Sequence, residues 1–248
     1  MAKTLELARQ FGLFEERYFN SSGTRNVIKS AVSKGTPSSY QQKFTYVVII
    51  DFESTCWNHG ERTPSQRNEI IEFPALLVNI NTGDILSQFH HYVQPLEQPT
   101  LSKFCMELTG ITQSQVDEAF PIDIVMAKFR RWMASISTDF SFTFNSGDGE
   151  LCAFATWTNW DLGICLAEEL KRKSIVFPEQ MKSWVDLKAV YKKFYSRSPR
   201  GLKQSMEEVG LEFEGREHSG IVDSRNTAKL LHKMVSDGCQ IGLTKSSS

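Results

Sequence analysis

The 248-residue sequence lacks any long hydrophobic run. No apolar stretch approaches the roughly 20 residues that a membrane-spanning helix needs, so we expect no membrane association. The first ten residues are amphipathic and contain no apolar core segment, so we also expect no signal peptide. These two absences predict an intracellular protein of the cytoplasm, the nucleus or both.

Cysteine is scarce and scattered. The five cysteines never stand in a C-x-x-C pair and lie at Cys56, Cys105, Cys152, Cys165 and Cys239. An odd number without paired spacing fits a reduced intracellular protein and argues against a zinc knuckle.

The sequence also lacks an excess of either charge. It has 28 Lys and Arg residues against 29 Asp and Glu residues, for a net charge of -1. The protein therefore has no overall basic field, and any contact with nucleic acid must use a local basic patch. With 40% hydrophobic and 23% charged residues, the composition is that of a globular protein.

The composition divides the chain into three parts. We predict an N-terminal arm and linker at 1–42, a domain at 43–240 and a flexible tail at 241–248. The arm has helically spaced apolar residues between Leu5 and Phe14, followed by a Ser-, Gly- and Lys-rich stretch with a linker at 35–40. Packing of the arm onto the domain and disorder both fit this pattern.

Hydrophobic periodicity predicts strands first and then strands that alternate with helices. The expected strands are 44–52, 70–80, 85–93, 140–144 and 151–157. The expected helices are 101–110, 113–119, 122–136, 162–170, 184–195, 201–210 and a last helix from about 219. The first three strands should form a β-meander, and the whole pattern predicts an α/β fold with a mixed sheet flanked by helices. His90 and His91 face opposite sides of the third strand, and we interpret both as structural.

The strand at 44–52 ends in two carboxylates. Side chains two apart in a strand point the same way, so Asp51 and Glu53 should lie side by side, with Phe52 turned away. Like charges held this close repel, and a cation between them relieves the repulsion. A pair of solvated acids at a strand-to-loop junction is the structural alternative.

Two further motifs carry acids. Asp161 follows a strand and opens a helix, where it could serve either as an N-cap or as a site residue. His218 should lie just outside the N-terminus of the last helix, with Asp223 on the second turn of that helix. A loop histidine five residues ahead of a helical acid can share a pocket with it. His232 lies too far along the helix to join them, whereas Arg225 and Asn226 have room to bond neighbouring loops.

The most basic stretch of the chain runs from 188 to 203. Its cations are Lys188, Lys192, Lys193, Arg197, Arg200 and Lys203, interleaved with the aromatic residues Tyr191, Phe194 and Tyr195. A solvated helix face and a flank that follows the phosphates of a nucleic acid both fit this pattern.

Taken together, these motifs resemble those of a known enzyme group. D-x-E at Asp51 and Glu53, the isolated Asp161, and H-x-x-x-x-D at His218 and Asp223 resemble the DEDDh group of 3′-to-5′ exonucleases, which have a ribonuclease H-like fold. Four segments in particular, 51–56, 101–117, 160–161 and 217–226, are similar to the Eri-type exoribonucleases. The resemblance covers about residues 44–240. Val222 departs from it, because the subgroup often has a second acid there.

The resemblance implies a function and the residues that perform it. It implies metal-dependent hydrolysis of RNA from the 3′ end with release of nucleoside 5′-monophosphates. Asp51, Glu53, Asp161 and Asp223 would hold two Mg²⁺ ions, which Mn²⁺ can replace; four acids without a cysteine suit such hard cations. His218 would act as general base, and Glu53 would be the second catalytic residue.

The same resemblance implies contacts with the substrate, which would be single-stranded RNA or an RNA 3′ overhang. The RNA 3′ end or the nucleoside monophosphate product would contact Glu53, Ser54 and His218, and Phe104 is a candidate for stacking on the terminal base. Two alternatives stay open. One is a DNA-directed exonuclease of the same group, since the same residues would serve both substrates. The other is a non-catalytic module that binds RNA ends, although such a module has no need of His218.

Overall fold

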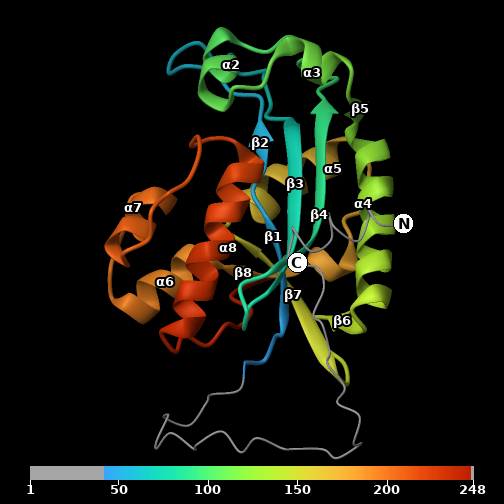
Figure 1. Ribbon diagram of the computed structural model, residues 1–248. Coiled ribbons are helices and arrows are strands. Elements are labelled where there is room, and N and C mark those ends of the chain that lie inside the picture. Colours follow the sequence, from blue (N-terminus) through green and yellow to red (C-terminus); the bar gives the residue numbers. More distant parts are fainter. Residues whose placement is uncertain (1–41, 247–248) are drawn as a thin grey trace, which may run out of the picture. The chain divides into compact units, whose positions relative to one another are not determined.

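The computed structural model describes residues 42–246, so the predicted arm lies outside the described residues except for Gln42. Within 42–246 the strands form a nine-stranded mixed sheet with helices on both faces (Figure 1). The strand order is β5-β4-β3-β1-β7-β8-β9, with β2 paired to β3 and β6 paired to β7. This architecture confirms the predicted α/β class.

The first part of the sheet is the predicted β-meander. β1 (Tyr46–Ile50), β3 (Ile70–Asn79) and β4 (Ile85–Gln94) pair antiparallel in that order. The predicted strand at 44–52 is shorter than expected, because β1 ends at Ile50 and β2 (Glu53–Ser54) pairs separately with β3 across a bulge. Asp51 and Phe52 lie between the two strands, and the Phe52 N–H donates to a side chain, Asp161 Oδ1, instead of to the sheet.

The second part of the sheet is mostly parallel. β7 (Glu150–Thr156) runs parallel to β1, and β8 (Ser183–Asp186) runs parallel to β7. Three short strands complete the whole sheet: β5 (Phe120–Pro121) pairs with β4, β6 (Phe142–Phe144) with β7, and β9 (Lys245–Ser246) with β8. Because β1 and β7 are parallel neighbours, the segments that follow them leave the sheet at the same edge.

Helices cover the two faces and one end of this sheet (Figure 1). One face carries α4 (Ile122–Asp139), the π-helix η1 (Asp161–Leu166) and α5 (Ala167–Arg172). The other face carries α6 (Leu187–Tyr195), α7 (Leu202–Glu208) and α8 (Gly220–Ser236). Short helices are α2 (Lys103–Thr109), α3 (Gln113–Asp117) and the 3-10 helix η2 (Glu179–Met181). Gly110 ends α2 in the left-handed conformation, and the Thr112 side chain caps α3.

Alternate residues of β1 contribute to different cores. Val48 and Ile50 pack with the α4 side, whereas Val47 and Ile49 pack with the α8 side, and all four are fully buried. A strand with helices on both faces needs an uninterrupted apolar run, which explains the sequence of β1. This buried strand fixes the position of the carboxylates that follow it.

Two predicted segments differ from the structure. The helix expected at 184–195 begins only at Leu187, because Ser183–Asp186 pair with β7 as β8 and the Asp186 side chain caps α6 by accepting from the Ala189 N–H at 2.9 Å. The tail expected to be flexible from 241 contributes to the fold: Ile241 is buried, and β9 pairs antiparallel with β8.

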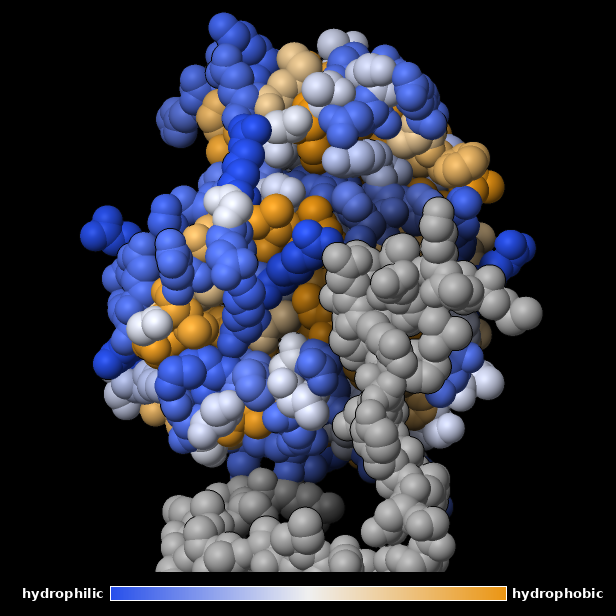
Figure 2. All heavy atoms as spheres, in the orientation of Figure 1, coloured by the Kyte–Doolittle hydropathy of each residue, from blue (hydrophilic) through white to orange (hydrophobic). Residues whose placement is uncertain are grey.

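One face of the described residues can be followed in a space-filling view. Figure 2 shows hydrophilic side chains over most of the visible face, with apolar side chains in separate patches. No helix within 42–246 has both the length and the apolar character needed to cross a bilayer.

Candidate active site

Three of the predicted carboxylates meet where β1 ends. Asp51 follows β1, Glu53 begins β2, and Asp223 comes from α8. One carboxylate oxygen of each lies within 4.8 Å of the others. Asp223 belongs to the first turn of α8, not the second, because the helix begins at Gly220. The structure thus brings together residues that are 170 positions apart in the sequence.

Asp161 lies beside these three carboxylates. It is the first residue of η1, with Trp160 as N-cap, so the interpretation of Asp161 as an N-cap is wrong. Its Oδ1 instead accepts the Phe52 N–H at 3.0 Å, between the two strand-end acids. The side chain is only 4% exposed. A π-helix at this point agrees with the frequent occurrence of such turns at functional sites.

The surroundings of the four acids oppose their ionisation. Burial raises the pKa of Asp51 well above its ordinary value, and the charges of Asp161 and Asp223 raise it further. Burial, followed by the charge of Glu72, raises the pKa of Glu53 to about 9. Burial also raises the pKa values of Asp161 and Asp223 to about 7 each, although backbone N–H donors partly offset this effect.

This set of acids fits divalent cations. Within the described residues, no lysine, arginine or histidine side chain forms an ion pair with any of the four. Buried like charges without a positive partner are costly, and bound cations would remove that cost. Carboxylate oxygens converging on one point are the ligands that hard divalent ions prefer.

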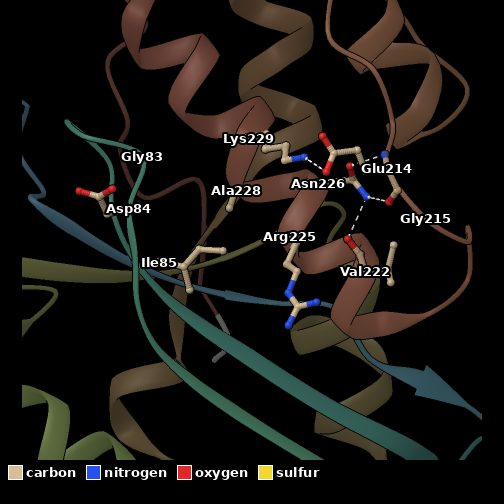
Figure 3. Close-up of a pocket in the computed structure, with 10 residues that line it drawn as sticks. All are labelled: Gly83, Asp84, Ile85, Glu214, Gly215, Val222, Arg225, Asn226, Ala228 and Lys229. Atoms are coloured by element: carbon tan, nitrogen blue, oxygen red, sulfur yellow. Dashed lines mark hydrogen bonds and ion pairs between the residues drawn. The ribbon is translucent and has the colours of Figure 1, made fainter. Parts of the chain in front are cut away.

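His218 lies next to the carboxylates on an exposed loop. Its backbone has a positive φ of 62°, and its N–H donates to Asp223 Oδ2 at 2.9 Å. Asn226 fastens this loop to α8, as Figure 3 shows: its side chain accepts the Glu214 N–H at 3.0 Å and donates to the Glu214 and Val222 carbonyls. The expectation that Asn226 bonds a neighbouring loop is therefore confirmed. Arg225, for which a loop contact was also expected, instead donates to Gln88 Oε1 of strand β4 at 2.9 Å.

A cavity of about 470 Å³ opens over these groups. Asp51, His218 and Asp223 line it. Its other walls include Trp157 and three cations of the basic stretch, which are Lys188, Arg200 and Lys203. Part of the basic stretch thus faces the candidate site, whereas Lys192, Lys193 and Arg197 do not line this cavity.

The two remaining predicted residues lie on the α2 side of the strand end. Ser54 is buried in β2, and its carbonyl accepts from Cys105 Sγ at 3.6 Å. Phe104 precedes Cys105 in the first turn of α2 and is half-buried. Neither Ser54 nor Phe104 lines the cavity of about 470 Å³, so their contacts with substrate stay predictions.

Sequence reasoning missed one buried acid at the site. Glu72 in β3 pairs in register with Glu53 and is 2% exposed. His90 Nε2 lies 2.8 Å from its Oε1, so His90 has a structural partner, as expected, and that partner belongs to the site. A single acid within the apolar run 70–80 was the available signal, because a charge in a buried strand needs a partner.

Comparisons with known proteins agree with this geometry. The family model described as Exonuclease matches residues 48–231. ERI1 exoribonuclease 2 of Danio rerio is 48% identical over 247 residues, which cover 97% of this chain and 42% of that protein. The Homo sapiens protein of the same name is 50% identical over 250 residues, covering 98% of this chain and 35% of that protein. This chain therefore spans less than half the length of these relatives.

A solved structure extends the agreement to the fold. The nuclease domain of 3′hExo, described as a DEDDh family member bound to rAMP, matches with a TM-score of 0.74 and 33% identity over 83% of this chain and 98% of that chain. The match confirms the expected ribonuclease H-like architecture. Its DEDDh designation agrees with the acids and the histidine found here at the end of β1, in η1 and at the start of α8. On sequence and structure together, the chain belongs to the exonuclease family, in its Eri-type DEDDh group.

Proposed function

We propose that this chain is a metal-dependent 3′-to-5′ exoribonuclease that releases nucleoside 5′-monophosphates from RNA. The observation that carries the proposal is the convergence of Asp51, Glu53 and Asp223 within 4.8 Å, with Asp161 and His218 beside them. The family membership supports phosphodiester hydrolysis as the reaction. An intracellular location is part of the same proposal.

The four acids are assigned to two divalent cations, with Mg²⁺ as the expected ion and Mn²⁺ as a substitute. When bound, such ions neutralise the negative charge that develops on the attacked phosphate and on the leaving oxygen. The protein contributes the placement of the ligands. Asp51 and Glu53 are fixed by the strand end, Asp161 by its bond from Phe52 and Asp223 by the first turn of α8.

His218 is assigned the proton transfer. An imidazole can accept a proton near neutral pH. His218 is exposed to solvent and lines the cavity. His218 takes a proton from the attacking water, and the water oxygen forms a bond to phosphorus. The bond from phosphorus to the 3′ oxygen of the preceding nucleotide breaks. The terminal nucleoside leaves with its 5′-phosphate, and the leaving 3′ oxygen takes a proton from solvent water to become the 3′-hydroxyl of the shortened strand, while His218 returns its proton to solvent.

RNA is the proposed substrate because the similar proteins are named exoribonucleases and the similar nuclease domain was solved with rAMP. Glu53 and the backbone of Ser54 are assigned to the 3′-hydroxyl of the terminal nucleotide, and Phe104 to its base. Lys188, Arg200 and Lys203 provide positive charge along the wall of the cavity for the phosphates upstream.

A degradation ladder tests the proposal. Single-stranded RNA with a 5′ label, and DNA of matched sequence, are incubated with the protein in Mg²⁺ and in EDTA. We expect stepwise shortening of RNA from the 3′ end that EDTA abolishes. The His218→Ala variant should lose about 10²- to 10⁴-fold in rate, as expected for loss of a general base.

The matched control is His232→Asn, at a histidine of α8, the helix that follows the His218 loop; its Nδ1 lies 3.2 Å from the Ile80 carbonyl. The Asn amide can keep that contact, so this variant should retain full activity. Shortening of DNA but not of RNA would favour the DNA-directed alternative. Binding of RNA without cleavage by the wild-type protein would mean that the acids form a binding site only.

A further inference from the structure

The Glu72 carboxylate joins three separate parts of the chain. It comes from β3, and its Oε2 accepts the Gly220 N–H of α8 at 2.9 Å. Its Oε1 accepts the Ile221 N–H at 3.2 Å and lies 2.8 Å from His90 Nε2 of β4. Both oxygens therefore already accept hydrogen bonds from the protein itself, and the Gly220 and Ile221 donors belong to the first turn of α8.

We propose that Glu72 and His90 form a positioning pair that fixes the first turn of α8 against the strand end carrying Asp51 and Glu53. Neither residue touches the reacting atoms in this arrangement. The pair acts through α8, which carries Asp223 and adjoins the His218 loop. This inference rests on the proposed function for its kinetic consequences, but its structural part can be tested without RNA.

The contact between α8 and the strand end is close enough to need glycine. A Cβ atom at Gly220 would lie 2.4 Å from the Asp51 carbonyl oxygen, 3.0 Å from Pro74 Cγ and 3.3 Å from Glu72 Oε2. The start of the helix is thus in contact with the backbone of a metal-ligand candidate. Glu72 supplies the acceptors that hold it there, because the first N–H groups of a helix have no partner within the helix.

The first turn of α8 lies between two residues of the site in the sequence. Gly220 comes two residues after His218 and three before Asp223. The Asp223 N–H donates to the Ser219 carbonyl at 2.8 Å, and the His218 N–H donates to Asp223 Oδ2 at 2.9 Å. A shift of the first turn would therefore displace the proposed base and one metal ligand together. A misplacement of about 1 Å at a reaction centre can cost roughly 10²-fold in rate.

The Glu72→Gln variant tests the pair. A carboxamide has nearly the same volume as a carboxylate but only one oxygen. Its NH₂ group would therefore face an N–H group from which a carboxylate oxygen accepts a hydrogen bond in the wild type. We expect kcat for RNA to fall about 10- to 100-fold with KM changed less than about threefold. We also expect the amide protons of Gly220 and Ile221 to exchange with deuterium at least about tenfold faster in the absence of RNA and metal.

Glu69→Gln is the matched control. Glu69 is also a fully buried acid near the start of β3, and its carboxylate accepts the N–H groups of Leu96, Glu97 and Gln98. This variant should lose stability and exchange faster at 96–98, while exchange at 220–221 and kcat per folded molecule stay near the wild-type values. This control distinguishes the effect of losing any buried carboxylate from the effect of losing the contact between Glu72 and α8.

A second variant covers the case in which Glu72→Gln does not fold. His90→Phe keeps a ring at a half-exposed position and removes only the Nε2 contact, so we expect about a 2- to 10-fold loss in kcat and faster exchange at 220–221. Unchanged exchange at Gly220 and Ile221 in both variants overturns the positioning role. Faster exchange there, in a protein that cleaves no RNA even as wild type, upholds the positioning role and overturns the proposed function.

Discussion

At the scale of single residues, Phe104 is the candidate substrate contact that is assigned to the terminal base, whereas Glu53 and Ser54 are assigned to the 3′-hydroxyl. It is half-buried on α2, and the same turn is tied to the strand end through Ser102 Oγ, which donates to the Cys56 carbonyl at 2.6 Å, and through Cys105. The proposed contact of Phe104 is stacking of its ring on the terminal base, an interaction that does not depend on the identity of the base.

We therefore predict that Phe104→Ala weakens RNA binding about 5- to 100-fold, the effect of losing one stacked base, with little change in kcat. Binding of labelled single-stranded RNA in Ca²⁺, measured by fluorescence anisotropy, provides the test. Phe120→Ala is the control, because Phe120 is 51% exposed on β5 and packs against Lys128. RNA affinity that is equal in the two variants would remove Phe104 from the site.

The individual site residues were predictable to different degrees. Asp51 and Glu53 could be expected to lie together, because the two-residue period of a strand places them on one side in any fold. The role of Glu72 could not, because the Gly220 N–H that it accepts is 148 residues away in the sequence. Only the register of β2 against β3 and the docking of α8 bring these groups together.

At the scale of the elements, the segment from α6 to α7 carries the basic stretch, and three of its cations line one wall of the cavity. Lys188 Nζ donates to the Arg200 carbonyl at 2.8 Å, and Lys203 pairs with Glu217 at 3.0 Å, so these cations are held close to the His218 loop. Lys192 lies on the exposed side of α6, away from the cavity. The position of a lysine relative to the cavity, not its presence in the basic stretch, should decide its effect.

Lys203→Gln should weaken RNA binding about 3- to 10-fold and reduce the slope of log K against log salt by roughly 0.7, the value for one contact with a single-strand phosphate. Lys192→Gln, which removes the same charge, should change neither quantity appreciably. Anisotropy titrations between 50 and about 200 mM salt measure both variants. Parallel salt slopes for the wild type and Lys203→Gln would contradict the assignment of this wall to the phosphates.

Helices and strands could be predicted from the sequence where a regular hydrophobic period extends over many residues. The helix predicted at 122–136 and the meander strands predicted at 70–80 and 85–93 agree closely with α4, β3 and β4. β8 was missed because Ser183–Asp186 has too few residues to show a period and runs directly into α6. Its identity as a strand comes from pairing with β7, a contact that local sequence does not encode.

At the scale of the whole molecule, the four buried acids of the site lower the stability of the folded protein when no cations are bound. Four acids are packed at the edge of a sheet whose two cores are otherwise apolar. In an unfolded chain these acids would titrate at their ordinary values near 4. In the folded protein, the pKa of Glu53 is raised to about 9 and those of Asp161 and Asp223 to about 7. Between those limits, the folded state without metal therefore binds more protons than the unfolded state.

The sign of the pH dependence follows directly. Stability falls with rising pH wherever the folded state holds the additional protons, so the contribution of the site is fully present below about pH 4 and is lost as the pH rises through 7 and then 9.

In EDTA, we predict that the Tm of the wild-type protein falls between pH 6 and pH 8.5 by on the order of 5 °C more than that of Glu53→Gln, which has no charge to gain at that position. Excess Mg²⁺ should raise the wild-type Tm more at pH 8.5 than at pH 6, because binding must displace fewer protons, and it should raise that of Glu53→Gln much less. Differential scanning fluorimetry at both pH values, with and without Mg²⁺, gives all of these quantities from one set of samples. If the two proteins lose Tm in parallel in EDTA and gain equally from Mg²⁺, then Glu53 neither carries the buried charge nor binds the ion, and the cation site must be formed by the other acids.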